Sequence, residues 1–355
     1  MTGAAGGRRR WAAFALALAF CIVSFAGGQI TGAEREDEGP VDLRVEPWPF
    51  SHDKDGRVAP GLYWRGGLKL ASPDPRFGGF SGLALSSDGT RLLAVSDDGW
   101  WLTARLVYDK GGVLVNLAEP FMAPLLDRSG KRARSKRGRD AEALTLLSPG
   151  VVDGRVAVGF ERRPRIEVFD LRKGSLDARP QPVPSPPAIR DGPNNAELEA
   201  LAYLSRGPLA NSFVAISERQ LDDAGNIRGW VFGKSRKTFA FTIARFDDFD
   251  VTDIAVLPDG DLMLLERSFN GLFPGLSLRR IKLAELKPGA LVKPVPLFEG
   301  KLPRYAIDNM EGIAVHKTAS GETRITLMSD DNYNRSLQNT IIMQFALKEA
   351  LGSRP

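Results

Sequence analysis

Five short apolar segments recur along this chain at a nearly constant spacing, and this repeat restricts the fold more than any other feature. The segments read FSGLAL, AEALTL, LEALAY, VTDIAV and MEGIAV. Their second residues lie 61, 57, 53 and 59 positions apart and are Ser81, Glu142, Glu199, Thr252 and Glu311. Because a four-stranded propeller blade has a similar length, the repeat predicts an all-β propeller.

Each segment is followed by a second apolar run that ends in an acidic residue, so each repeat begins with a predicted β-hairpin. The acidic residues are Asp97, Glu161, Glu218, Glu266 and Asp330. Opposed residues of a hairpin are equidistant from its turn. Pairing each acidic residue with the second residue of its segment centres four hairpins on turn dipeptides, such as Asp88-Gly89. The second hairpin centres on Val151-Val152, where we expect a longer turn.

The two ends of the chain complete the predicted blades. After NTIIMQFALKE the fifth blade still lacks one strand, and the N-terminal run GLYWRGGLKLA has the pattern to supply it. Such closure removes exposed sheet edges. We therefore predict one propeller domain over residues 58–350, after an N-terminal extension over 34–57. Five blades are favoured, and six are the alternative.

The first 33 residues have the pattern of an export signal peptide. Arg8, Arg9 and Arg10 precede the apolar run 11–28, which ends in small residues. We expect cleavage and a periplasmic or secreted protein without a stable membrane span, exported by the Sec or the twin-arginine route. An N-terminal anchor is the alternative. The only cysteine, Cys21, lies in this run, so the mature chain is expected to have no disulfide and no thiol catalysis.

The second residues of the five segments are the candidate metal ligands. The innermost strands of propeller blades line one channel, so equivalent residues form a ring. The ring of Ser81, Glu142, Glu199, Thr252 and Glu311 combines three carboxylates with two hydroxyls. Buried carboxylates need a positive partner, and an all-oxygen ligand set favours calcium or magnesium. We expect calcium as a cofactor. The alternative is that these groups bind backbone amides or share protons.

The acidic residues that end the second strands are expected around the same channel mouth, where Asp97, Glu161 or Glu218 would activate water. Arginines follow the three glutamates, and aspartates follow Asp97 and Asp330. The candidate substrate-binding residues are Asp98, Arg162, Arg219, Arg267, Glu266, Asp330 and Asp331. Arginine forks beside a cation suit a phosphoryl group. Pairing of each arginine with a neighbouring blade is the alternative.

Several motifs resemble one known family. FGGFSGLAL, DAEALTLL, ELEALAYL, IDNMEGIAV and the terminal SDDNYN…QNTIIMQFAL are similar to the bacterial phytase-like family, which takes its name from an esterase-like activity of phytase. This resemblance implies hydrolysis of phosphate or other esters. The chain is more distantly similar to apyrase-type, calcium-activated nucleotidases, five-bladed propellers with a Ser/Glu/Glu/Ser/Glu calcium column. Thr252 is the one departure from that column, and Asp253 beside it is an alternative ligand.

Other chemistries lack the residues they need. His52 and His316 are the only histidines and stand in no phosphatase motif, and there is no G-x-S-x-G elbow or nucleotide-binding glycine loop. Loss of the three leading arginines lowers the net charge from +5 to +2, so nucleic acid is not an expected partner. The basic run Arg128–Arg139 is expected to be a solvated loop, with capture of a polyanion as the alternative.

Two functions remain open at this point. The first is a calcium-dependent phosphoester hydrolase that acts on a small anionic substrate at the channel mouth. The second is a non-catalytic, calcium-stabilised propeller that binds a ligand or an envelope partner.

Overall fold

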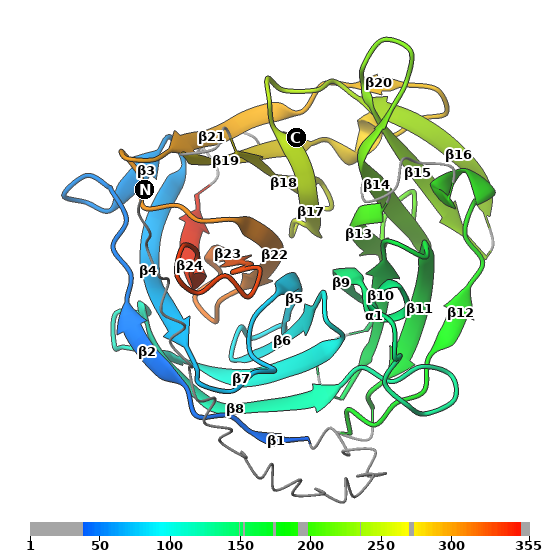
Figure 1. The fold of residues 1–355 in the computed structure, drawn as a ribbon. Helices are drawn as coiled ribbons and strands as arrows, with labels where there is room; N and C mark the ends of the chain where they lie inside the picture. Colours follow the sequence, from blue (N-terminus) through cyan, green and yellow to red (C-terminus); the bar gives the residue numbers. More distant parts are fainter. Residues whose placement is uncertain are drawn as a thin grey trace, which may run out of the picture. The chain divides into compact units, whose positions relative to one another are not determined.

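Alternating apolar runs and glycine turns fold into five sheets arranged around one axis (Figure 1). The computed structural model describes residues 38–348, except for 149, 152, 173–174, 191–197, 235 and 270–272. The predicted signal peptide lies outside the described residues. The described part confirms an all-β, five-bladed propeller. Within that part, no helix is long and apolar enough to cross a membrane.

Each blade begins with its innermost strand and continues outward through antiparallel neighbours. Blade 1 contains β5 (Phe80–Leu85), β6 (Arg91–Ser96), β7 (Trp100–Tyr108) and β8 (Leu114–Pro124). Blade 2 contains β9 (Ala141–Leu146), β10 (Arg155–Phe160), β11 (Arg165–Asp170) and β12 (Gln181–Val183). Blade 3 contains β13 (Leu198–Leu204), β14 (Ser212–Leu221), β15 (Ile227–Gly233), β16 (Arg236–Ile243) and a short parallel strand, β20 (Leu291–Val292).

The last two blades follow the same plan. Blade 4 contains β17 (Asp250–Val256), β18 (Leu262–Phe269), β19 (Pro274–Ile281) and β21 (Val295–Lys301). Blade 5 contains β22 (Met310–Lys317), β23 (Thr323–Ser329) and β24 (Thr340–Leu347). The helical segments of the described chain are short and lie in connections: α1 (Lys136–Arg139), η1 (Pro187–Arg190) and η2 (Leu283–Glu285).

Strands from the N-terminal part of the chain close the propeller. β4 (Leu62–Ala71) pairs antiparallel with β24, which confirms the predicted role of GLYWRGGLKLA. β2 (Arg44–Pro47) and β3 (Arg57–Ala59) both pair with β4, and β1 (Gly39–Pro40) pairs with β8 of blade 1. The segment 34–57, expected as an extension before the propeller, therefore contributes strands to two blades. These strands cover edges that would otherwise be open.

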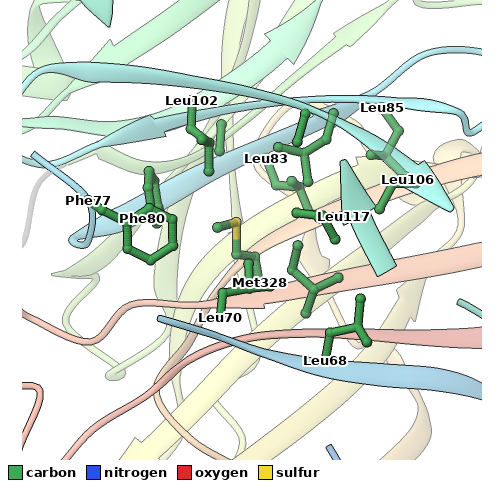
Figure 2. Close-up of a cluster of buried hydrophobic side chains, with 14 of the residues drawn as sticks. Leu68, Leu70, Phe77, Phe80, Leu83, Leu85, Leu102, Leu106, Leu117 and Met328 are labelled. Carbon is green, nitrogen blue, oxygen red and sulfur yellow. The ribbon is translucent and has the colours of Figure 1, made fainter. Parts of the chain in front are cut away.

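Apolar side chains fill the interfaces between successive blades. Figure 2 shows the interface of blades 5 and 1, where Leu83 and Leu102 face Leu68, Leu70 and Met328. These residues are almost completely buried. Full burial of one such side chain contributes about 1.5–3 kcal/mol. This packing fixes the blades and hence the relative positions of the residues at the two ends of the channel.

Candidate functional site

Every innermost strand contains a β-bulge at its predicted ring residue. In blade 1, Phe80 pairs with Ser96 and Gly82 pairs with Val95, so Ser81 is the extra residue without a ladder partner. The same interruption occurs at the other four ring positions, Glu142, Glu199, Thr252 and Glu311. A bulge changes the direction in which a side chain points. The repeat therefore encodes a backbone irregularity as well as a residue type.

The expected direct pairing of Ser81 with Asp97 is wrong, and its four counterparts are wrong in a similar way. The amide of Asp97 donates to the carbonyl oxygen of Gly79 at 2.8 Å. Direct pairing would require equal numbers of residues on the two strands between the pair and the turn. Because the bulge adds a residue to the inner strand, the true register is shifted by one or two positions in blades 1, 2, 3 and 5. In blade 4 the pairs after the bulge, such as Asp253 with Leu265, keep the predicted register.

The ring residues nevertheless share one end of the channel. The innermost strands lie side by side in the cyclic order β5, β9, β13, β17 and β22 (Figure 1), and each begins next to its ring residue. Burial raises the pKa of Glu142 well above its usual range, and the carboxylate of Glu199 raises it further. Burial likewise raises the pKa of Glu199, with Glu218, Glu161 and then Glu311 adding to the effect. The carboxylates therefore interact across the channel.

The two ring hydroxyls bind backbone groups. The Thr252 hydroxyl donates to the carbonyl oxygen of Met310 at 3.1 Å, and the Ser81 hydroxyl donates to that of Gly79 at 3.4 Å. Asp253, the alternative ligand, is fully buried and accepts backbone N–H bonds from Ile254 and Ile313 at 2.8 and 2.9 Å. Asp253 thus joins β17 to β22. The strongest acceptors of the ring are its three glutamates.

Blade 4 breaks the pattern of the outer acidic column. Asp97, Glu161 and Asp330 each donate a backbone bond to the residue two positions before their blade's ring residue. In blade 4 the residue in that place is Arg267, which pairs with Asp250. Glu266 stands one position earlier on the strand, and neighbouring residues of a strand point to opposite faces. The alignment that placed Glu266 in this column was off by one residue.

Glu266 lies inside blade 4 and is not brought to the channel mouth. Its side chain is fully buried and ion-paired with Arg279 of β19, whose Nε lies 2.6 Å from Oε2. The Ser277 hydroxyl donates to the same oxygen at 3.1 Å. Burial raises the pKa of Glu266, and the Arg279 bond opposes that rise. The expected substrate-binding role is therefore replaced by a structural ion pair.

Arg267 introduces a positive charge among the acidic groups. Its NH1 group donates to Asn309 Oδ1 at 2.6 Å, and its Nε lies 3.3 Å from Glu311 Oε1. Its NH2 group is 3.6 Å from Glu218 Oε1. Glu311 contributes most to raising the pKa of Arg267. Burial still raises the pKa of Glu311 to about 7 despite this partner. Arg267 thus neutralises the blade 3 and blade 5 side of the mouth.

The opposite side of the mouth holds a compact carboxylate cluster. One oxygen from each of Asp140, Glu142 and Glu161 lies within 4.8 Å of the others. Asp140 was missed by the sequence analysis, although it stands directly before AEALTL and is almost fully buried. Lys136 Nζ bridges this cluster to blade 1, at 2.6 Å from both Asp140 Oδ1 and Asp97 Oδ2.

The donor set at this cluster fits a hard divalent cation. All of its side-chain donors are carboxylate oxygens, the type that calcium prefers. Among the described residues, Oδ1 of Asp97 is buried without a hydrogen-bond partner. Burial raises the pKa of Asp97 in spite of its Lys136 partner. Asp140, Glu142 and Glu161 are therefore the residues that would hold a cation, with Asp97 beside them.

The remaining predicted rim residues are engaged with neighbouring groups. Arg162 Nε lies 2.8 Å from Asp140 Oδ2, and Arg219 binds Asp250. Asp331 accepts backbone bonds from Gly79 and Tyr333 at 3.0 and 3.1 Å. The other two residues are Asp330, whose Oδ1 accepts from the Asn332 amide at 2.6 Å, and Asp98.

The basic run Arg128–Arg139 is not a freely solvated loop. Arg132 and Arg139 bind the two carboxylate oxygens of Asp98 at 2.5 and 2.7 Å, and Lys136 binds Asp97 and Asp140. Arg128 pairs with Glu167 at 3.2 Å. The run therefore folds over the acidic rim of blades 1 and 2. Of the aspartates that hold it there, Asp98 was expected to bind substrate and Asp97 to activate water, whereas Asp140 was not predicted.

Tyr333 is a second residue that the sequence analysis missed. Asn332 and Tyr333 both adopt left-handed backbone conformations, with φ of 47° and 52°. The ring lies against Gly79, where an added Cβ would stand 2.5 Å from a ring carbon and 2.4 Å from Asp97 Oδ1. Burial raises the pKa of Tyr333, and Asp97 adds to the rise. Strained residues of this kind cluster at functional sites.

Fold and site together define a β-propeller with a buried acidic centre at one channel mouth, offset toward blades 1 and 2. A family model confirms the resemblance drawn from the motifs. The Phytase-like model, described as esterase-like activity of phytase, matches residues 75–333, and the chain belongs to this family. The matched segment includes all five innermost strands. No curated protein is significantly similar to the chain.

Proposed function

We propose that this protein is an exported, calcium-dependent phosphoester hydrolase that acts on a small anionic substrate at the acidic channel mouth. The observation that carries the proposal is the cluster of Asp140, Glu142 and Glu161 at the start of the blade 2 hairpin. Membership of the Phytase-like family supports a phosphoesterase. The basic and apolar pattern of residues 1–33 supports export to the periplasm or the medium.

In this proposal the cation is held by Asp140, Glu142 and Glu161, and Glu199 adds negative charge from blade 3. Bound calcium would neutralise charge on the phosphoryl group. The predicted contribution of Ser81, Thr252 and Glu311 to cation binding is secondary. Both hydroxyls donate to carbonyl oxygens, and Glu311 pairs with Arg267.

Glu218 is the best of the three candidate bases for water. Asp97 is occupied by Lys136, and Glu161 belongs to the cation cluster. Burial raises the pKa of Glu218, with Arg267 and Arg219 opposing the rise. A general base works best when its pKa lies near the working pH. Glu218 would therefore take a proton from the attacking water while remaining next to two arginines.

Arg162 and Arg219 would bind the substrate phosphate. Their side chains are about half exposed, at 44% and 56%, while their carboxylate partners are buried. A guanidinium has five N–H donors, so an arginine that pairs with one or two carboxylates retains donors for phosphate. Arg267 is less exposed and more heavily paired. Its proposed role is to hold Glu218 and Glu311 in place.

One observation favours a second function, a non-catalytic propeller with a structural cation. Arg162, Arg219 and Arg267 each have a carboxylate partner, so none is reserved for substrate alone. Under this alternative the acidic mouth binds calcium for stability and the rim binds a ligand or an envelope partner.

Two measurements on the mature protein test the proposal. Calcium titration with thermal melting should raise the melting temperature of the wild type, and Glu142→Gln should abolish the rise. Glu299→Gln, a matched change on the outer strand β21, should leave it intact. Hydrolysis of p-nitrophenyl phosphate should need calcium and fall at least 100-fold in Glu218→Gln. Calcium binding without turnover selects the non-catalytic alternative, and no calcium response refutes both.

A further inference from the structure

The end of the channel opposite to the acidic mouth holds a cavity of about 450 Å³. The ring residues stand where the innermost strands begin, and the cavity residues stand where those strands end. All five blades contribute to its lining. The cavity is therefore a separate site on the propeller axis, built from different residues than the acidic cluster.

The repeat arranges the cavity lining in layers. Four of the five residues two positions beyond the ring residues form its floor: Leu83, Leu144, Ile254 and Ile313. The residues four positions beyond form its wall: Leu85, Leu146, Tyr203, Val256 and Val315. The residues six positions beyond form its rim: Ser87, Ser148, Ser205, Pro258 and Lys317. These floor and wall positions are apolar apart from the Tyr203 hydroxyl, and the lining also includes Thr145 and His316.

The wall is unusual because much of it reaches solvent. Leu146, Tyr203, Val256 and Val315 are each only partly buried, although they stand near the ends of strands, where polar residues would fold equally well. Contiguous exposed apolar surface in a soluble protein marks a binding site more often than chance. A concave, mainly apolar space of 300–1,000 Å³ with a few polar groups is typical of small-molecule sites.

The rim favours an anionic group. Lys317 is exposed and, within the described part of the chain, forms no ion pair, and the exposed guanidinium of Arg206 donates to the Pro258 carbonyl at the rim. Of the nearby carboxylates, one is neutralised by an arginine and the other, which keeps its charge, is held within its own turn. Asp259 pairs with Arg280, while Asp88 accepts from the hydroxyls of its own turn. Positive charge at the rim is thus available above an apolar wall.

We propose that this cavity binds a small amphiphilic carboxylate, with its aliphatic chain against the wall and its carboxylate at Lys317 and Arg206. The inference is independent of hydrolysis at the acidic mouth. Two cations at the rim select the anionic head, and the absence of side-chain carboxylates and amides from floor and wall selects a chain without polar groups. The serines of the rim can donate to the same head group.

Isothermal titration of the purified mature protein with octanoate and decanoate tests this site. The expected result is one saturable equivalent for each ligand. Burial of a methylene contributes about 0.8 kcal/mol, so decanoate should bind about 15-fold more tightly than octanoate. Binding of several equivalents, or equal affinity for both chain lengths, would overturn the proposal.

Matched variants locate the binding. Val256→Asp places a charge in the wall and should weaken decanoate binding more than tenfold, whereas Val295→Asp changes an exposed valine of β21 and should not. If Val256→Asp does not fold, Val256→Thr keeps the side-chain shape and should still weaken binding. Lys317→Gln should weaken it two- to fivefold, and Lys293→Gln should have no effect. Equal effects of the paired variants would place the ligand elsewhere.

Discussion

Substitution of Glu266 tests whether this residue stabilises blade 4 through a buried ion pair or binds substrate, as expected from the sequence. Glu266 and Arg279 form an ion pair inside the blade, with side chains 0% and 4% exposed. Arg279 also donates to the Ala244 carbonyl at 3.1 Å and stacks on the Phe246 ring at 5.3 Å. Glu266→Gln keeps the shape of the side chain but leaves the guanidinium without its counter-charge.

The expected loss is large because no solvent reaches the pair. Removing one partner of a buried ion pair costs about 3–5 kcal/mol, mainly from the uncompensated charge that remains. Replacing both residues, as in Glu266→Met with Arg279→Met, should cost less than either single change, because apolar pairs of similar size pack as well. The exposed pair of Glu299 and Lys301 is the control, and Glu299→Gln should cost less than about 1 kcal/mol.

Urea unfolding followed by circular dichroism gives the free energies of the wild type, Glu266→Met, Arg279→Met and the double variant, which form a double-mutant cycle. Glu266→Gln and Glu299→Gln are measured in the same way. The folded Glu266→Gln variant should keep the wild-type calcium response, because its carboxylate lies away from the mouth. A loss below about 1 kcal/mol would contradict the buried-pair account. If the variant folds but no longer responds to calcium, Glu266 must contribute to the channel site, and its assignment to the buried ion pair alone would be wrong.

Three further predictions follow from other parts of the propeller. Burial lowers the pKa of His316 to about 4, so at this residue the unfolded chain binds more protons between pH 4 and 6.5, and the contribution of His316 to stability should fall by about 3 kcal/mol as the pH drops through this range. Carboxyl groups with raised pKa values, such as Glu311, act in the opposite direction, so the test compares the free energy of unfolding of the wild type with that of His316→Gln. The wild type should lose about 3 kcal/mol relative to the variant between pH 6.5 and 4, and a difference that does not change with pH would contradict this account. Gly79 has a φ of +66°, and an added Cβ would lie 2.4 Å from Asp97 Oδ1 and 2.5 Å from the Tyr333 ring. Gly79→Ala should therefore lower the free energy of unfolding by about 1–3 kcal/mol in the same assay. An unchanged urea midpoint would refute the close packing of Tyr333. A chain that starts at Trp48 loses β1 and β2, which uncovers the edges of β8 and β4. It should therefore aggregate on heating, as measured by light scattering. Scattering equal to that of the full chain would argue against edge protection by β1 and β2.

The periodic part of the fold could be predicted from the sequence because each blade repeats the same short pattern of apolar and polar residues. FSGLAL and its four counterparts are apolar strands with one polar residue at the same place, and the closing strand in GLYWRGGLKLA has an alternating pattern of its own. Propeller class, blade number and closure all follow from these short-range signals. The glutamates Glu142 and Glu199 were found in the same way.

The features that could not be predicted from the sequence depend on one-residue shifts in strand register and on contacts between distant parts of the chain. The bulge at each ring residue adds a residue that no propensity marks, so the pairs before the bulge were displaced in every hairpin, and in blade 4 only those pairs were. In blade 4 that shift exchanged Glu266 for Arg267. Lys136 and Arg132 reach blade 1 from a loop whose composition alone predicts a solvated run. Only the folded structure shows that carboxylates at the rim attract it.

The departures from five-fold symmetry indicate where chemistry can occur. A symmetric ring of carboxylates would repel itself equally on every side and would hold a cation on the axis. Arg267 supplies a fixed positive charge between Glu218 and Glu311, so that side of the mouth needs no metal. The other carboxylates lie close together at Asp140, Glu142 and Glu161, where Lys136 and Arg162 both pair with Asp140. Lys136 stands on the short helix α1, in the connection between blades 1 and 2, whereas Arg267 stands within β18 of a blade. Under the proposed function, Lys136 is therefore the cation that a divalent ion would displace more easily.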